Sequence, residues 1–199
     1  MSVNKQNRHK RSKKQRNDLN KRRNSDYQNE ATNVRRTALI GNWIVAIGTV
    51  VSAIGGTPST IFTKQTRDDF RLIGPTLEAV GIALVAETED TILYTVGDQI
   101  QAIGNLNVIA GVLSRNEQIE PLLEKQGDSA QLVGLGLVIK TAGPLTLLQT
   151  LYNTGLMIQL IGTAIEVYAI RGTVVAEDIK ALGAWIKAGG AILTALATE

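Results

Sequence analysis

Glycine recurs every seven residues in several separate parts of this 199-residue chain, each time with similar neighbours. The repeated unit reads Gly-x-x-Ile/Leu-x-Ala-Ile/Val, more or less, and another glycine follows it. Seven residues are close to two turns of an α-helix, so successive glycines share one face of a helix, whereas in a strand they would alternate between faces. The repeat therefore predicts helices. The copies begin at Gly41, Gly74, Gly97, Gly136, Gly155 and Gly183.

A glycine inside a helix costs about 1 kcal/mol relative to alanine, so something must offset several of them. Close approach of a partner helix over a groove of small residues is the expected offset. Gly55-Gly56, Gly127 and Gly172 are instead interpreted as helix ends, where glycine is common. The glycines assigned to helix packing are Gly41, Gly48, Gly81, Gly104, Gly111, Gly162 and Gly190.

The apolar periodicity predicts an all-α fold, a bundle of five or six of these glycine-heptad helices. No six-residue stretch alternates convincingly as a strand would. Thr66 is the expected N-cap of the second helix, and the unequal spacing of the copies excludes a solenoid of fixed period. The expected helices are 36–54, 67–86, 91–113, a short polar one at 117–125, 129–142, 145–170 and 175–197.

Charge divides the chain at residue 36. Residues 1–36 carry twelve Lys/Arg and three Asp/Glu, whereas the other 163 residues carry nine and fifteen. The first segment has almost no apolar residues, so we expect a disordered polybasic tail at 1–36 followed by a repetitive helical domain at 37–199. The tail lacks the apolar region of a secretory signal.

The basic tail predicts binding of a polyanion, either nucleic acid or an anionic membrane surface. A solubilising tail without a specific partner explains the same charges. The candidate polyanion-binding residues are Lys10, Arg11, Lys13, Lys14, Arg16, Lys21, Arg22 and Arg23.

Two of the side chains that enzymes commonly use in catalysis are missing from residues 37–199. The chain has no cysteine, and its one histidine, His9, lies in the tail, so neither a Ser-His-Asp triad nor a Cys/His zinc site is expected in the helical domain. No phosphate-binding or dinucleotide-binding glycine motif is present. Glu78 and Glu166 are interpreted as ordinary charges on helix surfaces. We therefore expect a non-enzymatic protein without a catalytic site, cofactor, metal or small-molecule substrate.

Two long uncharged stretches, 37–63 and 141–165, leave open whether the bundle is soluble or membrane-inserted. Both exceed the roughly 20 residues that span a bilayer. Their polar residues, and the polar face formed by Asp98, Gln101 and Asn105, favour a cytoplasmic bundle that is soluble or peripherally associated with a membrane. The alternative is a membrane-inserted or membrane-active helical protein.

Helix faces that carry few polar side chains also predict self-association into a homo-oligomer. Trp43 and Trp185 occupy the same place in the first and last copies of the repeat, where they are candidate interface anchors. The other interpretation is that they fill space beside a glycine or cover the ends of the bundle. The function predicted from the residues is thus a structural or interaction protein, namely a self-associating bundle with a polyanion-binding arm.

Two strings carry a family resemblance. Gly41-Asn-Trp-Ile-Val-Ala-Ile-Gly-Thr-Val-Val-Ser-Ala-Ile-Gly-Gly-Thr-Pro-Ser59 and Gly97-Asp-Gln-Ile-Gln-Ala-Ile-Gly-Asn105 resemble segments of a glycine-rich repetitive family of unknown function from spore-forming Gram-positive bacteria. The resemblance covers most of 37–199 and leaves out the basic tail. It implies a bacterial helical repeat with no established activity, and it transfers no site.

Overall fold

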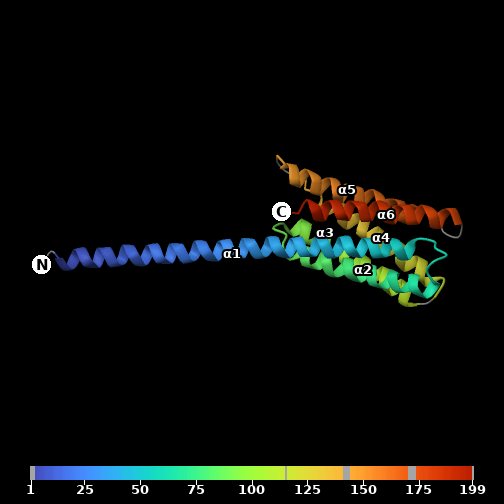
Figure 1. Cartoon of the computed structure of the whole chain (residues 1–199), viewed down its shortest axis with the longest axis horizontal. Coiled ribbons are helices and arrows are strands. Elements are labelled where there is room, and N and C mark those ends of the chain that lie inside the picture. The colour runs from blue at the N-terminus through green and yellow to red at the C-terminus, as the bar shows by residue number, and fades with distance from the viewer. Residues whose placement is uncertain (1–2, 115, 141–143, 170–173, 199) are drawn as a thin grey trace. The chain divides into compact units, whose positions relative to one another are not determined.

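The computed structural model describes residues 3–114, 116–140, 144–169 and 174–198, without the side chains of 3–15, 17–19 and 174–175. The predicted all-α bundle is confirmed, because these ranges contain helices and no strand (Figure 1). The helices are α1 (Val3–Gly56), α2 (Lys64–Ala86), α3 (Ile92–Ser114), α4 (Ile119–Val138), α5 (Leu147–Tyr168) and α6 (Val174–Leu196).

The chain divides into two units, Met1–Arg36 and Thr37–Glu199. Helix α1 begins at Val3, so the basic segment is helical where disorder was expected. The segment contains no glycine or proline and is rich in Lys and Arg, which are good helix formers. A helix that is already formed at Thr37 also removes the cost of nucleation. The side chains described in this segment are exposed, so no core holds it.

The six helices form three antiparallel hairpins, α1–α2, α3–α4 and α5–α6, and glycines meet at the crossings. A β-carbon on Gly41 would lie 2.8 Å from the carbonyl oxygen of Gly81, and one on Gly104 would lie 2.6 Å from that of Gly127. In the third hairpin, a β-carbon on Gly162 would lie 2.6 Å from the Gly183 carbonyl oxygen. Backbone therefore touches backbone, which only glycine permits.

Alanines join the first hairpin to the last. Ala53 of α1 packs with Ala184 and Ala188 of α6, and Ala46 of α1 packs with Ala191 and Ala195. Helices α2 and α3 also contact each other, as do α4 and α5. The three hairpins thus surround a common interior.

The second hairpin differs from its sequence-based prediction. Helix α4 is one helix over Ile119–Val138, where two helices and an end at Gly127 were expected. Gly127 lies inside α4 because the Gly104 backbone occupies the space of a side chain there. The repeat in α4 also has another register: Gly127 and Gly134 face α3, whereas a β-carbon on Gly136 would meet only Leu160, at 3.8 Å.

Some helix ends also shift. The N-cap of α2 is Thr63, whose hydroxyl accepts the Thr66 backbone N–H, so Thr66 belongs to the first turn. The predicted end at Gly55-Gly56 is confirmed, since α1 ends at Gly56. Gly172 lies outside the described residues. Helix α5 begins at Leu147, after a capping box in which Thr146 and Gln149 satisfy each other's backbone N–H groups.

Candidate functional site

The polarity of the bundle is inverted: polar and charged side chains are buried between its helices, and large apolar side chains are exposed. The buried residues include four acids carried by helices and a lysine, with Glu78 only 1% exposed. Such groups are rarely buried without partners, so their arrangement needs a physical account. The buried polar and charged residues are Asn42, Thr49, Glu78, Asp98, Gln101, Asn105, Glu124, Asp128, Gln131, Asn153, Gln159, Thr163, Lys187 and Thr194.

Three of these residues occupy the same position in the three hairpins. Glu78 in α2, Gln131 in α4 and Lys187 in α6 each lie four residues after one packing glycine and three before the next. That spacing places each of them on the glycine face of its helix, which points inward. The hairpin repeat therefore brings one carboxylate, one amide and one ammonium group together in the interior.

The ammonium group of Lys187 joins this trio. Its Nζ donates to Glu78 Oε2 at 2.7 Å and to Gln131 Oε1 at 2.5 Å. The hydroxyl of Ser52 donates to the other oxygen of Glu78 at 2.6 Å, and Gln131 Nε2 donates to Asn105 Oδ1 at 3.2 Å. Each charge thus has a partner, which a buried ion pair requires. We call Glu78, Gln131 and Lys187 the central trio.

A cavity of about 60 Å³ adjoins the central trio, and Asp128 and Glu166 also line it. It shares Gly56, Arg71, Glu124 and Lys180 with a more open cavity of about 310 Å³. These charged groups pair with one another. Arg71 contacts Glu120 at 2.8 Å and Glu124 at 3.4 Å, and the Lys180 ammonium donates to Glu124. The central trio therefore connects to one end of the bundle through charged residues.

Polar groups continue from the trio towards the opposite end. Gln101 Nε2 donates to Asp98 Oδ1 at 3.1 Å, and Gln159 Nε2 donates to Thr194 Oγ1 at 2.9 Å. These four residues line a smaller cavity of about 20 Å³.

At the far end of α4, Lys140 pairs with Glu89 at 3.2 Å and lies over the Tyr94 ring. Polar side chains thus occur at every level of the interior.

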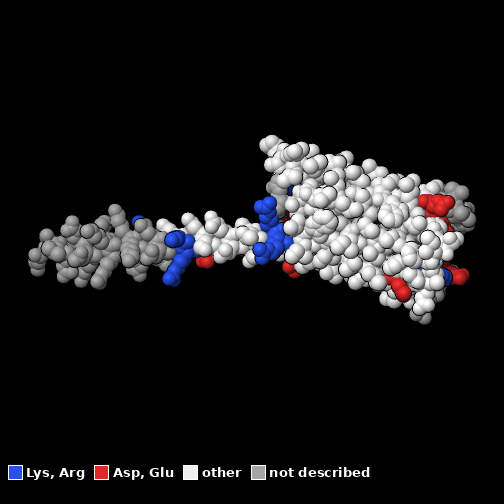
Figure 2. All heavy atoms as spheres, viewed as in Figure 1, with Lys and Arg blue, Asp and Glu red and all other residues white. Residues whose placement is uncertain are grey.

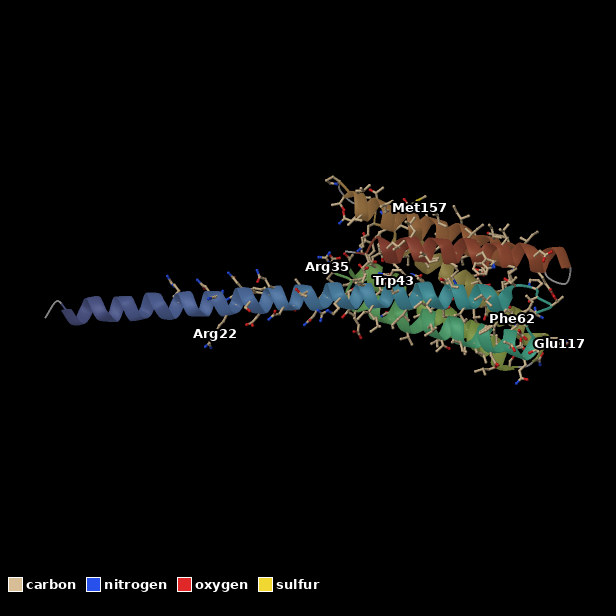
Figure 3. All side chains as sticks on the ribbon, in the orientation of Figure 1. Arg22, Arg35, Trp43, Phe62, Glu117 and Met157 are labelled. Atoms are coloured by element: carbon tan, nitrogen blue, oxygen red, sulfur yellow. The ribbon has the colours of Figure 1, made fainter. Side chains whose placement is uncertain are left out.

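The outer surface has the opposite character. Exposed large apolar side chains occur on all six helices, for example Ile47, Ile73, Ile103, Val133 and Ile161, and also Leu196 in α6. Within the described part of residues 37–199, every exposed charged residue lies in a loop or in the first two turns of α2, α4 or α6. Figure 2 shows acidic side chains at the end of the bundle where Glu117 and Phe62 lie in Figure 3, and none at mid-height on the visible face.

The glycines assigned to packing lie at helix contacts. A β-carbon added to Gly48 would lie 2.8 Å from the backbone nitrogen of Glu78, and one added to Gly190 would lie 2.6 Å from the backbone nitrogen of Gln159. At Gly111 it would lie 3.0 Å from the Glu120 carbonyl oxygen.

The two tryptophans are on the outer surface, and the Trp185 indole donates to Thr57 Oγ1 at 3.0 Å. Figure 3 shows Trp43 towards the other end of the bundle from Phe62. Of the candidate polyanion-binding residues, Arg16, Lys21, Arg22 and Arg23 are exposed, and the side chains of Lys10, Arg11, Lys13 and Lys14 lie outside the described ones.

Several polar residues were placed on the wrong side by the sequence-based interpretation. Glu78 is buried and Glu166 lines the central cavity, so neither is an ordinary surface charge. Asp98, Gln101 and Asn105 likewise face inward. An amphipathic pattern separates two faces without stating which is inside. The spacing from the packing glycines was the signal that could have decided it.

Within the described residues, no group of three or more His, Cys, Asp or Glu side chains could hold a metal ion. The interior instead combines carboxylates, a lysine, amides and hydroxyls, which are joined by hydrogen bonds. No curated protein and no solved structure matches the chain. One family does, over residues 36–195, which begin where the basic segment ends. The chain therefore belongs to the family of unknown function DUF6944.

Proposed function

We propose that residues 37–199 form an integral membrane bundle of six transmembrane helices, with the basic segment 1–36 on the cytoplasmic side. The observation that carries this proposal is the inverted polarity of the bundle. Apolar side chains facing acyl chains need no further partner, whereas in water so many of them would favour aggregation. Buried polar side chains and packing glycines are both typical of helix contacts within membranes.

The helix lengths support the same proposal. The portion of α1 in the bundle, Thr37–Gly56, is about 30 Å long at 1.5 Å per residue, which equals the hydrocarbon thickness of a typical bilayer. Helix α3 has 23 residues, and its one charged residue, Asp98, is buried. An apolar belt of about bilayer thickness therefore separates two charged ends.

Two of the described helices, Asn20–Gly56 and Ala176–Leu196, are long and apolar enough by composition to cross a membrane. Composition averages the two faces of a helix. Helix α3 carries Asp98, Gln101 and Asn105 inward and Val96, Ile103 and Leu106 outward, so its average hides an apolar outer face. The burial pattern therefore adds a second observation to the composition.

The aromatic residues support placement at two interfaces. Trp43 and Tyr94 lie near one end of the bundle, and Phe62 and Tyr168 lie in or beside the connections at the other. The Trp185 indole reaches Thr57, the residue that follows α1. Trp and Tyr concentrate at both surfaces of a membrane because their rings are apolar and their N–H or O–H groups are polar.

Charge predicts the orientation. Residues 1–36 carry twelve Lys/Arg, and Arg35-Arg36 directly precede the first apolar stretch. Positive residues beside a transmembrane helix favour the cytoplasmic side. Anionic lipids of that leaflet attract basic segments by about 1 kcal/mol per Lys or Arg near the surface. We therefore propose these lipids as the polyanion for the exposed Lys21, Arg22 and Arg23.

Single cysteines test this proposal directly, because the chain has no cysteine of its own. We would place one cysteine at a time in bacteria that express the protein: Asn116→Cys, Asp90→Cys and Met157→Cys. Each is labelled with a membrane-impermeant maleimide before and after lysis of the cells. Asn116 and Asp90 are exposed connections at opposite ends, and Met157 is 53% exposed at the outer edge of α5 (Figure 3).

We expect Asn116→Cys to react in intact cells, Asp90→Cys to react only after lysis, and Met157→Cys to react only after denaturation. Met157 is the deciding position, because exposure to acyl chains blocks labelling and exposure to water permits it. Rapid labelling of Met157→Cys in native lysate, together with a discrete particle without detergent in size-exclusion chromatography with light scattering, would contradict the proposal. That result would favour a soluble self-associating bundle.

A further inference from the structure

We propose that the interior of the bundle conducts protons between its two ends, with Glu78 and Asp98 as the carboxylates that carry the proton. This inference rests on the proposed membrane insertion, because a path needs two separated aqueous sides. It goes further by assigning an activity to the buried polar residues. Ionisable groups inside a membrane bundle are costly and mark ion or proton paths.

The entrance is the end of the bundle where Arg71, Glu124 and Lys180 meet. The cavity of about 310 Å³ there shares these three residues with the cavity beside the central trio. Glu78 lines the inner cavity, where Lys187 and Ser52 hold its two carboxylate oxygens. Water that enters the outer cavity therefore has a polar way to Glu78.

Asp98 is the carboxylate of the opposite half. It is 5% exposed, and Gln101 donates to its Oδ1 atom. Its Oδ2 atom is buried and has no hydrogen-bond partner in the described part of the chain. An ionised carboxylate oxygen left unpaired in this setting is expensive, whereas a protonated one is not. Asp98 also lines the small cavity of about 20 Å³, where a water molecule can donate a proton to it or accept one from it.

Amide side chains connect the two halves. Gln131 accepts from Lys187 in the central trio and donates to Asn105 at 3.2 Å. Asn105 Nδ2 in turn donates to the backbone carbonyl oxygen of Gln101 at 3.3 Å, and the Gln101 side chain donates to Asp98. Polar atoms thus follow one another without an apolar layer between them. Amides do not release protons, so they orient the water molecules that carry the charge between the carboxylates.

The dimensions exclude hydrated ions and organic solutes. Cavities of about 60 and 20 Å³ hold a few water molecules at most, since one water needs roughly 10–15 Å³ measured in this way. A hydrated sodium or potassium ion with its shell, or an organic solute, does not fit. Protons need only a chain of hydrogen-bonded groups and waters.

The transfer conserves atoms and charge. A hydronium ion in the outer cavity gives its proton to the Glu78 carboxylate, forming the carboxylic acid and leaving water. The acid then gives that proton to a neighbouring water, and the Glu78 carboxylate pairs with Lys187 again. The hydronium formed in that step passes the proton to the Asp98 carboxylate, and Asp98 then gives the proton to water on the side of the far end. One elementary charge crosses for each proton, so the membrane potential drives the flux.

Purified full-length protein in liposomes that contain a pH-sensitive dye tests the inference. A potassium gradient with valinomycin sets an inside-negative potential, and the dye reports proton entry. We expect faster entry than in empty liposomes. Asp98→Asn and Glu78→Gln, which keep size and shape, should each lower the rate at least about a hundredfold, the lower end of the range for loss of a positioned proton-transfer group. Glu117→Gln, at an exposed connection, is the matched control and should keep the full rate.

Flotation of every sample after carbonate and high-salt washing separates the two proposals. Wild-type protein that does not float overturns membrane insertion itself. Protein that floats but admits protons no faster than empty liposomes overturns proton conduction alone. Proton conduction is also overturned if Asp98→Asn and Glu78→Gln both admit protons at the wild-type rate, or if sodium enters as fast as protons do. If either variant fails to insert, wild-type protein is instead treated with a carbodiimide, which reacts with protonated carboxyl groups in apolar surroundings. This treatment must block proton entry.

Discussion

The glycine contacts between helices predict that replacing a packing glycine by alanine destabilises the bundle, although alanine has the higher helix propensity. Gly104→Ala places a β-carbon 2.6 Å from the Gly127 carbonyl oxygen and 2.9 Å from Gln131 Cγ. Ordinary contacts of a β-carbon begin near 3.4 Å, so α3 and α4 must separate by roughly 0.8 Å. Overpacking of this kind costs about 1–3 kcal/mol, against a gain of about 1 kcal/mol from alanine propensity. We expect a net loss of up to about 2 kcal/mol in the free energy of unfolding.

Gly189→Ala is the matched control, since Gly189 lies within α6, is exposed, and has nothing within 4 Å of a β-carbon. There only the propensity gain applies, so we expect stabilisation of about 0.5–1 kcal/mol. Far-UV circular dichroism during titration of a mild-detergent sample with SDS measures both variants. Equal stabilisation of the two would refute the backbone contact between α3 and α4, and with it the explanation of the heptad.

Three further outcomes follow from the contacts. Lys187→Met leaves the buried Glu78 carboxylate without its ion-pair partner and should cost about 3–5 kcal/mol in the same titration. Addition of Glu78→Gln should recover most of this loss, and no recovery would contradict the pairing. Arg22→Gln with Arg23→Gln should weaken binding to anionic vesicles by about 2 kcal/mol at low salt and not at high salt; a salt-independent loss would contradict electrostatic attraction. Thr146→Ala removes the capping box of α5 and should cost about 1 kcal/mol, and an unchanged midpoint would refute the cap.

The positional equivalence of the central trio also explains the repeat. The glycine faces of α2, α4 and α6 are built alike, and each places one polar residue between two packing glycines. The three residues differ in charge and hydrogen-bonding capacity, so they complement one another where identical residues would not. Three copies of Glu78 or of Lys187 would repel one another. Divergence of the copies at this position therefore gives the central trio complementary partners.

Much of the fold follows from periodicity. A seven-residue spacing of glycine indicates helices with one small-residue face, and the structure has them. The abrupt change of charge at residue 36 coincides with the border between the two units of the chain. What periodicity missed was the register of α4, because Gly134 and Gly136 both fit a heptad and only contact with α3 distinguishes them.

The sequence by itself determined that the chain is helical, that its helices pack through glycine, and that catalytic side chains such as Cys and His are missing from the bundle. Only the tertiary structure decided which face of each helix is inside. The physical reason is that an amphipathic pattern is symmetrical with respect to solvent: the same helix buries its apolar face in water and its polar face in lipid. Contacts between residues more than 50 positions apart decide which face is inside. Lys187, for example, donates to Glu78 and Gln131, so residues that resemble surface charges in the sequence lie in the interior of the bundle.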